Sequence, residues 1–364
     1  MATIYLEPGT DATQDLTFFA STVGTATSAT DQYVTGGRSL KISIASSFSA
    51  AKTATGMAAD TGRRISFNYR FTALPAAGGS FQLLSVPNST DGEVLALRLL
   101  PGGTIRIDNG VGTSLANGTT VLSVNTWYRI SFSYTVTNTT TFTAKYYLNG
   151  VLEATAIDSG TLDGTGSSKV VFSAYSPSVT ADFWFDNIYV DDGSDYTDPG
   201  DIRVTAKRPN ANGTTNDFST QIGAGGSGYG SGHSPQVNER PLSTTNGWSI
   251  VGAGSAVTEE YNIENLSTGD VDLTSKTLVD YIGWLYTSAL AAETGQIIVN
   301  NANSNIALTT TNTLFIKVAG STTYPAGTGT DIGMITDTTL TTVSLYECGI
   351  IFAYRTRGNF FPFF

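Results

Sequence analysis

The residues with the clearest chemical potential are aspartates in an aromatic stretch, ADFWFDNIYVDDG, at positions 181–193. Carboxylate oxygens on a loop suit calcium, so Asp191, Asp192 and Asp195 form a candidate calcium site. The loop lacks the glutamate and the spacing of an EF-hand, and the alternative is that it only begins a linker. Asp186 stands among apolar residues and needs a hydrogen-bonding partner if it is buried.

Aromatic side chains suggest a second chemistry, the binding of sugars. Rings beside amide and carboxylate groups can hold a sugar, and Trp184, Tyr189 and Trp248 are the candidates. Aromatic residues at alternating positions of a strand more often fill a core. A glycan contact at these residues therefore stands beside a purely structural role.

Catalytic constellations are scarce in the sequence. The single histidine, His233, lies in a glycine-rich loop, and the single cysteine is the distant Cys348, which we expect to be a buried thiol. This combination supplies neither a rigid Ser-His-Asp triad nor a zinc site. Glu259 and Glu260 are adjacent, so a strand would direct them to opposite faces, unlike the paired carboxylates of a glycosidase. We expect a protein that is not an enzyme and needs no cofactor.

The composition predicts an all-β protein of two domains. Of 364 residues only 13% are charged, against a typical ~25%, while 40% are hydrophobic and 39 are glycine. Short β-branched and aromatic runs recur at spacings of roughly 8 to 15 residues between Gly, Asn, Asp and Pro, as in sandwiches. The net charge of −11 argues against nucleic acid as a partner.

Three segments illustrate the expected strands. In WYRISFSYTV, alternation directs Ile130 and Phe132 to one face and Arg129 and Ser131 to the other. In TAKYYLNGVLEAT, the Asn-Gly pair predicts a tight hairpin. Residues 278–290 fit either a helix or a strand, and we expect a strand.

A boundary is expected where the composition changes after the acidic stretch. We assign residues 1–195 to the first domain, 196–240 to a linker and the glycine-rich loop, and 241–364 to a second β-sandwich. The first residues, MATIYLEPGT, contain no basic leader or apolar segment, and no apolar run approaches the ~18 residues of a membrane helix. We expect a soluble protein without a Sec-type signal.

Four motifs in order carry a family resemblance over residues 1–195: GTATSATDQYVTGGRSLKI, NTWYRISFSYTV, TAKYYLNGVLEAT and ADFWFDNIYVDDG. Together they resemble the concanavalin A-like, laminin-G-like sandwich. The next segments, TDPGDIRVTAKRPNANGTTNDFSTQIG and VNERPLSTTNGW, resemble structural proteins of tailed bacteriophages. The matching positions of these later segments are Gly200, Asp201, Arg203, Pro209, Asn210, Gly213, Asn238, Glu239 and Pro241.

The resemblance implies two jelly-roll-like β-sandwiches, the first of them concanavalin A-like, in a virion component assembled in the host cytoplasm. It does not name the place in the particle, so capsid decoration and a host-facing part of the tail are both open. The expected partners are other virion proteins and further copies of the chain, and a host surface glycan is a candidate partner. The alternative is a carbohydrate-binding adhesion module, and a glycan-cleaving enzyme is less favoured.

The C-terminal stretch YRTRGNFFPFF ends in four aromatic residues, Phe360, Phe361, Phe363 and Phe364. Exposed apolar clusters of this kind mark interaction sites. The tail either completes its own domain or docks on a neighbouring subunit, and the virion resemblance favours docking.

Deletion of residues 359–364 is therefore expected to leave both domains folded and to abolish oligomerisation or incorporation into a particle. Sedimentation of the truncated protein measures this. An unchanged oligomer would show that the tail is not an assembly contact.

Overall fold

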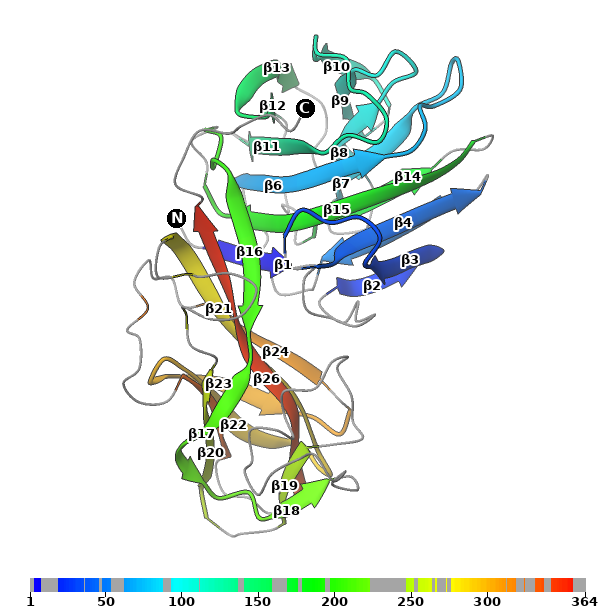
Figure 1. Cartoon of the computed structure of the whole chain (residues 1–364). Coiled ribbons are helices and arrows are strands. Elements are labelled where there is room, and N and C mark those ends of the chain that lie inside the picture. The colour runs from blue at the N-terminus through cyan, green and yellow to red at the C-terminus, as the bar shows by residue number, and fades with distance from the viewer. Residues whose placement is uncertain are drawn as a thin grey trace. The chain divides into compact units, whose positions relative to one another are not determined.

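The computed structural model describes strands and the turns between them (Figure 1). The described residues are 3–7, 19–35, 37–45, 48–53, 62–87, 93–110, 112–136, 141–158, 169–175, 179–193, 197–222, 247–251, 255–263, 266, 273, 276–311, 313–318, 324, 331–336 and 342–355. They contain no helix, so the all-β prediction is confirmed. Those up to Arg203 form one compact unit, and those from Val204 to Arg355 form a second.

The first unit is built from two antiparallel sheets. The larger has the order β13-β12-β11-β6-β15-β4-β3, with β1 also paired to β15. Its strands are β1 Thr3–Glu7, β3 Thr25–Ala29, β4 Ser39–Ala45, β6 Gly62–Phe71, β11 Tyr128–Val136, β12 Phe142–Leu148, β13 Val151–Asp158 and β15 Thr180–Asp191. The smaller has the order β10-β9-β8-β7-β14-β5-β2. Its strands are β2 Phe19–Val23, β5 Phe48–Thr53, β7 Phe81–Pro87, β8 Glu93–Leu99, β9 Ile105–Asn109, β10 Ser114–Asn117 and β14 Val171–Tyr175.

Aromatic rings fill the core of this first sandwich. Phe67 on β6 contacts Phe172 on β14 edge-to-face, with ring centroids 5.4 Å apart, and Phe185 on β15 packs against both. Because Phe172 belongs to the smaller sheet and the other two to the larger, these rings join the two layers. Alternation then leaves the polar half of each strand on the outer faces of the sandwich.

The second unit also contains two antiparallel sheets. One has the order β18-β19-β26-β21-β24, with β16 also paired to β26, and the other the order β17-β20-β25-β22-β23. The strands of the first are β16 Ile202–Lys207, β18 Thr220–Ile222, β19 Gly247–Val251, β21 Thr277–Ala289, β24 Thr313–Val318 and β26 Thr342–Arg355. Those of the second are β17 Pro209–Asn216, β20 Val257–Ile263, β22 Glu293–Val299, β23 Ala302–Leu308 and β25 Ile332–Thr336.

The core of the second unit holds the cysteine of the chain. Cys348 on β26 is fully buried, as expected, and packs in the same cluster as Leu285 and Ile350. Burial raises the pKa of its thiol well above the ordinary value. The thiol is therefore a packing group that is not reactive.

The short-range sequence predictions are confirmed. Residues 278–290 lie almost entirely in β21, which is paired on both sides, with β24 and β26. The Asn149-Gly150 pair joins β12 to β13, and both residues have positive φ, 49° and 90°. Ile130 and Phe132 face the core, while Arg129 and Ser131 face the other way.

The side chains of β15 do not alternate strictly between the two faces of the sheet, because a bulge interrupts the strand. Asn187 adopts a φ of 52°, and the pairing with β6 shifts between Asp186 and Tyr189. The core therefore receives Phe185 on one side of the bulge and Ile188 on the other. Strict alternation would have placed these two residues on opposite faces.

The domain boundary also differs from the expected one. Residues 196–240 were assigned to a linker and the glycine-rich loop, and within this range the structure has β16, β17 and β18. From Val204 these strands pair within the two sheets of the second unit. Pro209 stands at the first position of β17, where a strand tolerates proline.

Substitution of Gly150 by Ala is expected to lower the free energy of unfolding by about 1–2 kcal/mol, because an L-residue at this φ is strained. A Cβ at this position would also lie 2.8 Å from Nη2 of Arg129. Urea denaturation measures the loss. Gly102→Ala is the matched control, since a Cβ there meets nothing within 4 Å, and an equal loss in both variants would contradict the argument.

Candidate functional site

A row of polar side chains crosses four neighbouring strands of the seven-stranded sheet. Gln82 on β7 lies opposite Arg98 on β8, Arg98 lies opposite Arg106 on β9, and Arg106 lies opposite Asn117 on β10. Directly paired residues share a face, so the four side chains form one line. Neighbouring strands are ~4.8 Å apart, which makes the row about 14 Å long.

The apolar half of the same strands fixes the direction of this row. Leu97 and Leu99 flank Arg98 in sequence, and Ile105 and Ile107 flank Arg106, and all four aliphatic residues are buried in the core. Since side chains of a strand alternate, the two arginines must project from the outer face of the sheet.

Asp108 holds the two arginines of the row in place. Its carboxylate is fully buried beneath their guanidinium groups. Nε of Arg98 lies 3.0 Å from Oδ2 of Asp108, and Arg106 donates from both Nε and Nη2, the latter at 2.6 Å. A bidentate pair of this kind fixes the plane of the guanidinium group. Both arginines are therefore oriented before any ligand arrives.

Glu93 is a second carboxylate at this site. Its Oε1 accepts a hydrogen bond of 2.6 Å from Nη2 of Arg98. Burial raises the pKa of Glu93, and the nearby charge of Asp108 adds to the rise while Arg98 opposes it. The cluster thus contains two guanidinium groups and two carboxyl groups. Asp108 is fully buried, and burial disfavours the ionised form of Glu93.

The bonds within the cluster leave several donors without an acceptor. Among the described residues, none accepts a hydrogen bond from Nη1 of Arg98 or Arg106, or bonds to the side-chain amides of Gln82 and Asn117. Guanidinium and amide groups are the side chains that bind carboxylates and hydroxyls with directed hydrogen bonds. The row can therefore hold an extended ligand that carries hydroxyl groups and a carboxylate.

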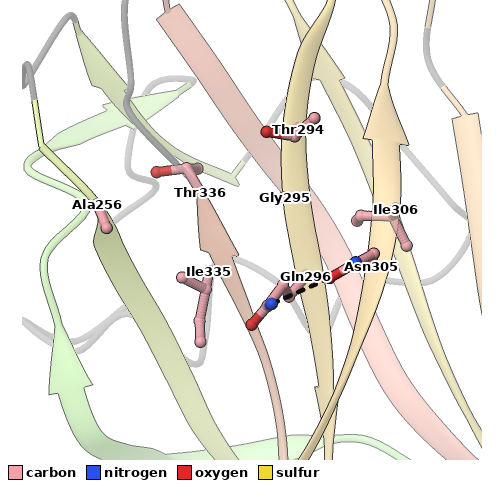
Figure 2. Close-up of a pocket in the computed structure, with 8 residues that line it drawn as sticks. All are labelled: Ala256, Thr294, Gly295, Gln296, Asn305, Ile306, Ile335 and Thr336. Carbon is pink, nitrogen blue, oxygen red and sulfur yellow. Dashed lines mark hydrogen bonds between the residues drawn. The ribbon is translucent and has the colours of Figure 1, made fainter.

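The five-stranded sheet of the second unit carries a separate hollow of about 360 Å³ (Figure 2). Its described lining comes from the residue before β20 and from β22, β23 and β25, and none of these described residues is charged. The lining residues are Ala256, Thr294, Gly295, Gln296, Asn305, Ile306, Ile335 and Thr336.

The outer face of the eight-stranded sheet is occupied by the chain's own carboxylates. Asp198 accepts hydrogen bonds of 2.6 and 2.8 Å from Arg129 and one of 2.7 Å from Ser131. Burial alone would raise the pKa of Asp198, but the bonds and charge of Arg129 outweigh it and lower the pKa. Arg129 and Ser131 thus bond to the chain's own carboxylate, while Nε of Arg129, Nη1 of Arg70 and the hydroxyl of Ser133 on the same face have no hydrogen-bond partner among the described residues.

The predicted calcium ligands are only partly within the described chain. Asp191 is fully buried and forms a bidentate pair with Arg64, at 2.9 and 2.7 Å, and it also accepts a bond from the amide of Gly193. Asp192 is exposed, and Asp195 lies outside the described residues. Among the residues that the structure describes, no three His, Cys, Asp or Glu side chains gather to hold a metal ion. The calcium site stays a prediction.

The aromatic residues predicted to contact glycan are buried or half-buried. Trp184 is 4% exposed, donates its indole N–H to Asp31 and has Lys41 over its ring, 4.9 Å from the centroid. Tyr189 is also 4% exposed, and Trp248 is half-buried against the second core. Neither Trp184 nor Tyr189 presents an open ring face to a ligand.

Two further predicted features cannot be placed. His233 and the tail residues Phe360, Phe361, Phe363 and Phe364 lie outside the described residues. No described segment is a helix with the length and apolar character to cross a membrane.

No family model and no curated protein matches the chain. Solved structures do resemble it. They include an endo-β-1,4-glucuronan lyase from the fungus Trichoderma reesei, at 10% identity and a TM-score of 0.40, covering 50% of this chain and 93% of that one. They also include the alginate lyase AlgAT5 of polysaccharide lyase family 7, at 14% identity and a TM-score of 0.34, covering 44% and 81%. A carbohydrate esterase of the Shiga toxin-encoding bacteriophage phi24B matches at 16% identity and a TM-score of 0.37, covering 51% and 98%.

These comparisons correct one expectation. We expected a protein that is not an enzyme, and the similar structures include two polysaccharide lyases and a carbohydrate esterase, so that exclusion is withdrawn. The likeness assigns no activity to this chain.

Sequence reasoning missed the polar row, although part of its signal was present. VLALRLL and GTIRIDNG each place arginine between aliphatic residues, which indicates an outward arginine on each of two strands. Asp108 lies beside both arginines because of the register of β8 and β9. Neither segment specifies that register alone.

Asp186, the aspartate that needed a partner, is 1% exposed at the bulge of β15. Its carboxylate accepts backbone N–H bonds from Val34 at 2.7 Å, Thr35 at 3.0 Å and Asn187 at 2.7 Å. Burial raises its pKa to about 7, against these bonds and the charge of Arg203. The bonds from Val34 and Thr35 hold the segment before β4 against β15.

As the pH rises from about 4 to about 7, the titration of Asp186 is expected to lower the free energy of unfolding of the first unit. Its folded-state pKa is about 7 and its ordinary pKa 3.8, so in this window the folded chain keeps a proton that the unfolded chain has lost. Since a pKa difference of one corresponds to about 1.4 kcal/mol, the decline amounts to a few kcal/mol. Asp186→Asn should lower stability at all pH values and remove this part of the slope.

Urea denaturation of both proteins at pH 5 and pH 7.5 measures the slope. The difference between wild type and variant isolates Asp186 from other carboxyls with raised pKa, such as Asp331. Parallel profiles for the two proteins would show that Asp186 does not titrate in this range.

Proposed function

We propose that the protein is a glycan-binding component of a tailed-phage particle, and that its ligand is an oligosaccharide bearing carboxylate groups. The observation that carries the proposal is the row of Gln82, Arg98, Arg106 and Asn117 on the outer face of the seven-stranded sheet.

The length of the row supports an oligosaccharide. A line of donors about 14 Å long exceeds the reach of a single sugar ring and suits a short chain laid across the strands. The amides at its two ends, on Gln82 and Asn117, can both donate to and accept from hydroxyl groups. No described residue blocks their side-chain amides by a hydrogen bond.

The centre of the row supports a carboxylate on that chain. Nη1 of Arg98 and Nη1 of Arg106 are available there, and Asp108 holds both guanidinium groups in a fixed plane. Oriented guanidinium groups bind carboxylates better than flexible ammonium groups do. The net charge of −11 opposes approach only at low salt, because charges beyond ~8–10 Å are screened at physiological ionic strength.

The virion part of the proposal is supported by the sequence resemblance, in particular the motifs around Gly200, Asp201 and Arg203. Capsid decoration and a host-facing place in the tail are its two forms, with other virion proteins and further copies of the chain as partners. The truncation of the aromatic tail, measured by incorporation into particles, tests this part separately from glycan binding.

Glycan binding is tested by calorimetric titration of the full chain with uronate oligosaccharides and with neutral oligosaccharides of the same linkage. We expect the uronate chains to bind at least tenfold more tightly. The double variant Arg106→Gln with Asp108→Asn should lose most of this preference. Both substitutions are needed because Arg106→Gln alone leaves a buried carboxylate short of a partner, which is strongly destabilising.

Lys145→Gln on β12 of the other sheet is the control for a lost positive charge, and it should bind like the wild type. Equal binding of acidic and neutral chains, or unchanged binding by the double variant, would contradict the proposal. Analysis of the ligand after titration also shows whether it has been cleaved.

A further inference from the structure

The hollow on the five-stranded sheet has a lining of a different character from the arginine row. Gln296 on β22 lies opposite Asn305 on β23 and donates to its Oδ1 at 3.0 Å. Asn303 donates to Oε1 of Gln296 at 3.2 Å. These bonds fix the orientation of three exposed amide groups. Nδ2 of Asn305 donates to no described residue, and Asn305 is one of the residues that line the hollow (Figure 2).

The opposite side of the hollow is aliphatic. Ile335 on β25 is the direct partner of Gln296 on the other side of β22. A branched apolar side chain therefore lies one strand spacing, ~4.8 Å, from the amide row. Thr294 adds a hydroxyl and a methyl group near the rim, as Figure 2 shows.

None of the described lining residues is charged, which restricts the class of ligand. A charged group in this hollow would find no opposite charge among the lining residues and would lose hydration without compensation. Amides offer a donor and an acceptor at fixed places, as neighbouring hydroxyls of a sugar require, and the aliphatic side suits the C–H face of the ring. The volume of about 360 Å³ is at the small end of ligand pockets.

We propose that this hollow is a second binding site, and that it takes a neutral sugar, either free or as the end of a neutral glycan. It is independent of the arginine row, because its residues belong to the second unit. Without an aromatic ring among the lining residues the affinity is expected to be weak, on the order of millimolar. The two sites would let one chain recognise an acidic and a neutral part of a surface.

The proposal is tested with the full chain by saturation-transfer NMR and titration with glucose, galactose, N-acetylglucosamine and glucuronate. At least one neutral sugar should bind with a millimolar Kd, and glucuronate should bind this hollow at least fivefold more weakly. Asn305→Ala and Gln296→Ala should each weaken binding of the neutral sugar by fivefold or more. Asn262→Ala is the matched control, since Asn262 is an amide on β20 of the same sheet outside the hollow.

Binding measurements on variants of each site distinguish this hollow from the arginine row. The double variant at Arg106 and Asp108 should leave the binding of the neutral sugar unchanged, and Asn305→Ala should leave that of the acidic oligosaccharide unchanged. The proposal is overturned if no neutral sugar binds at tens of millimolar, or if Asn305→Ala and Gln296→Ala bind within twofold of the wild type. Thermal unfolding of each variant confirms that it is folded.

Discussion

The constraint on which the first sandwich depends is the pairing of carboxylates that its sheets bury. Asp108, Asp191 and Asp198 lie on or beside strands whose other half fills an aromatic and aliphatic core. A carboxylate in such a place is costly unless its charge is compensated, and an arginine compensates each of these three. These pairs determine which donors remain for a ligand and which are used internally.

The two sheets of the first sandwich differ in how their carboxylates are paired with arginines. On the eight-stranded sheet, Arg64 and Arg129 are matched by carboxylates from Asp191 and the segment after β15, and Ser131 and Thr197 complete the bonds. On the seven-stranded sheet, two arginines share Asp108, so guanidinium donors exceed the acceptors of the fully buried carboxylate. On the first face each of these two arginines has a carboxylate of its own, and on the second two arginines share one fully buried carboxylate.

The sequence predicts the strands well and the sites poorly, for physical reasons. Alternation and the Asn149-Gly150 turn are local signals, and the structure follows both. The bulge at Asn187 is invisible to a pattern of period two, because one left-handed residue reverses the facing of everything after it. The pairing of Asp108 with Arg98 depends on strand register, which arises from packing across the sheet and not from either strand alone. The aromatic residues Trp184 and Tyr189 gave a strong signal that belonged to packing.

The burial of the Cys348 thiol has a consequence for how the chain would respond to an oxidising environment. A protein that leaves a reducing cytoplasm for an oxidising environment meets conditions in which exposed thiols form crosslinks. Here the only cysteine of the chain lies within a β-sheet core, with its ionisation suppressed by burial. The covalent structure of the chain is therefore expected to be the same in reducing and in oxidising surroundings, and its stability rests on packing, hydrogen bonds and ion pairs.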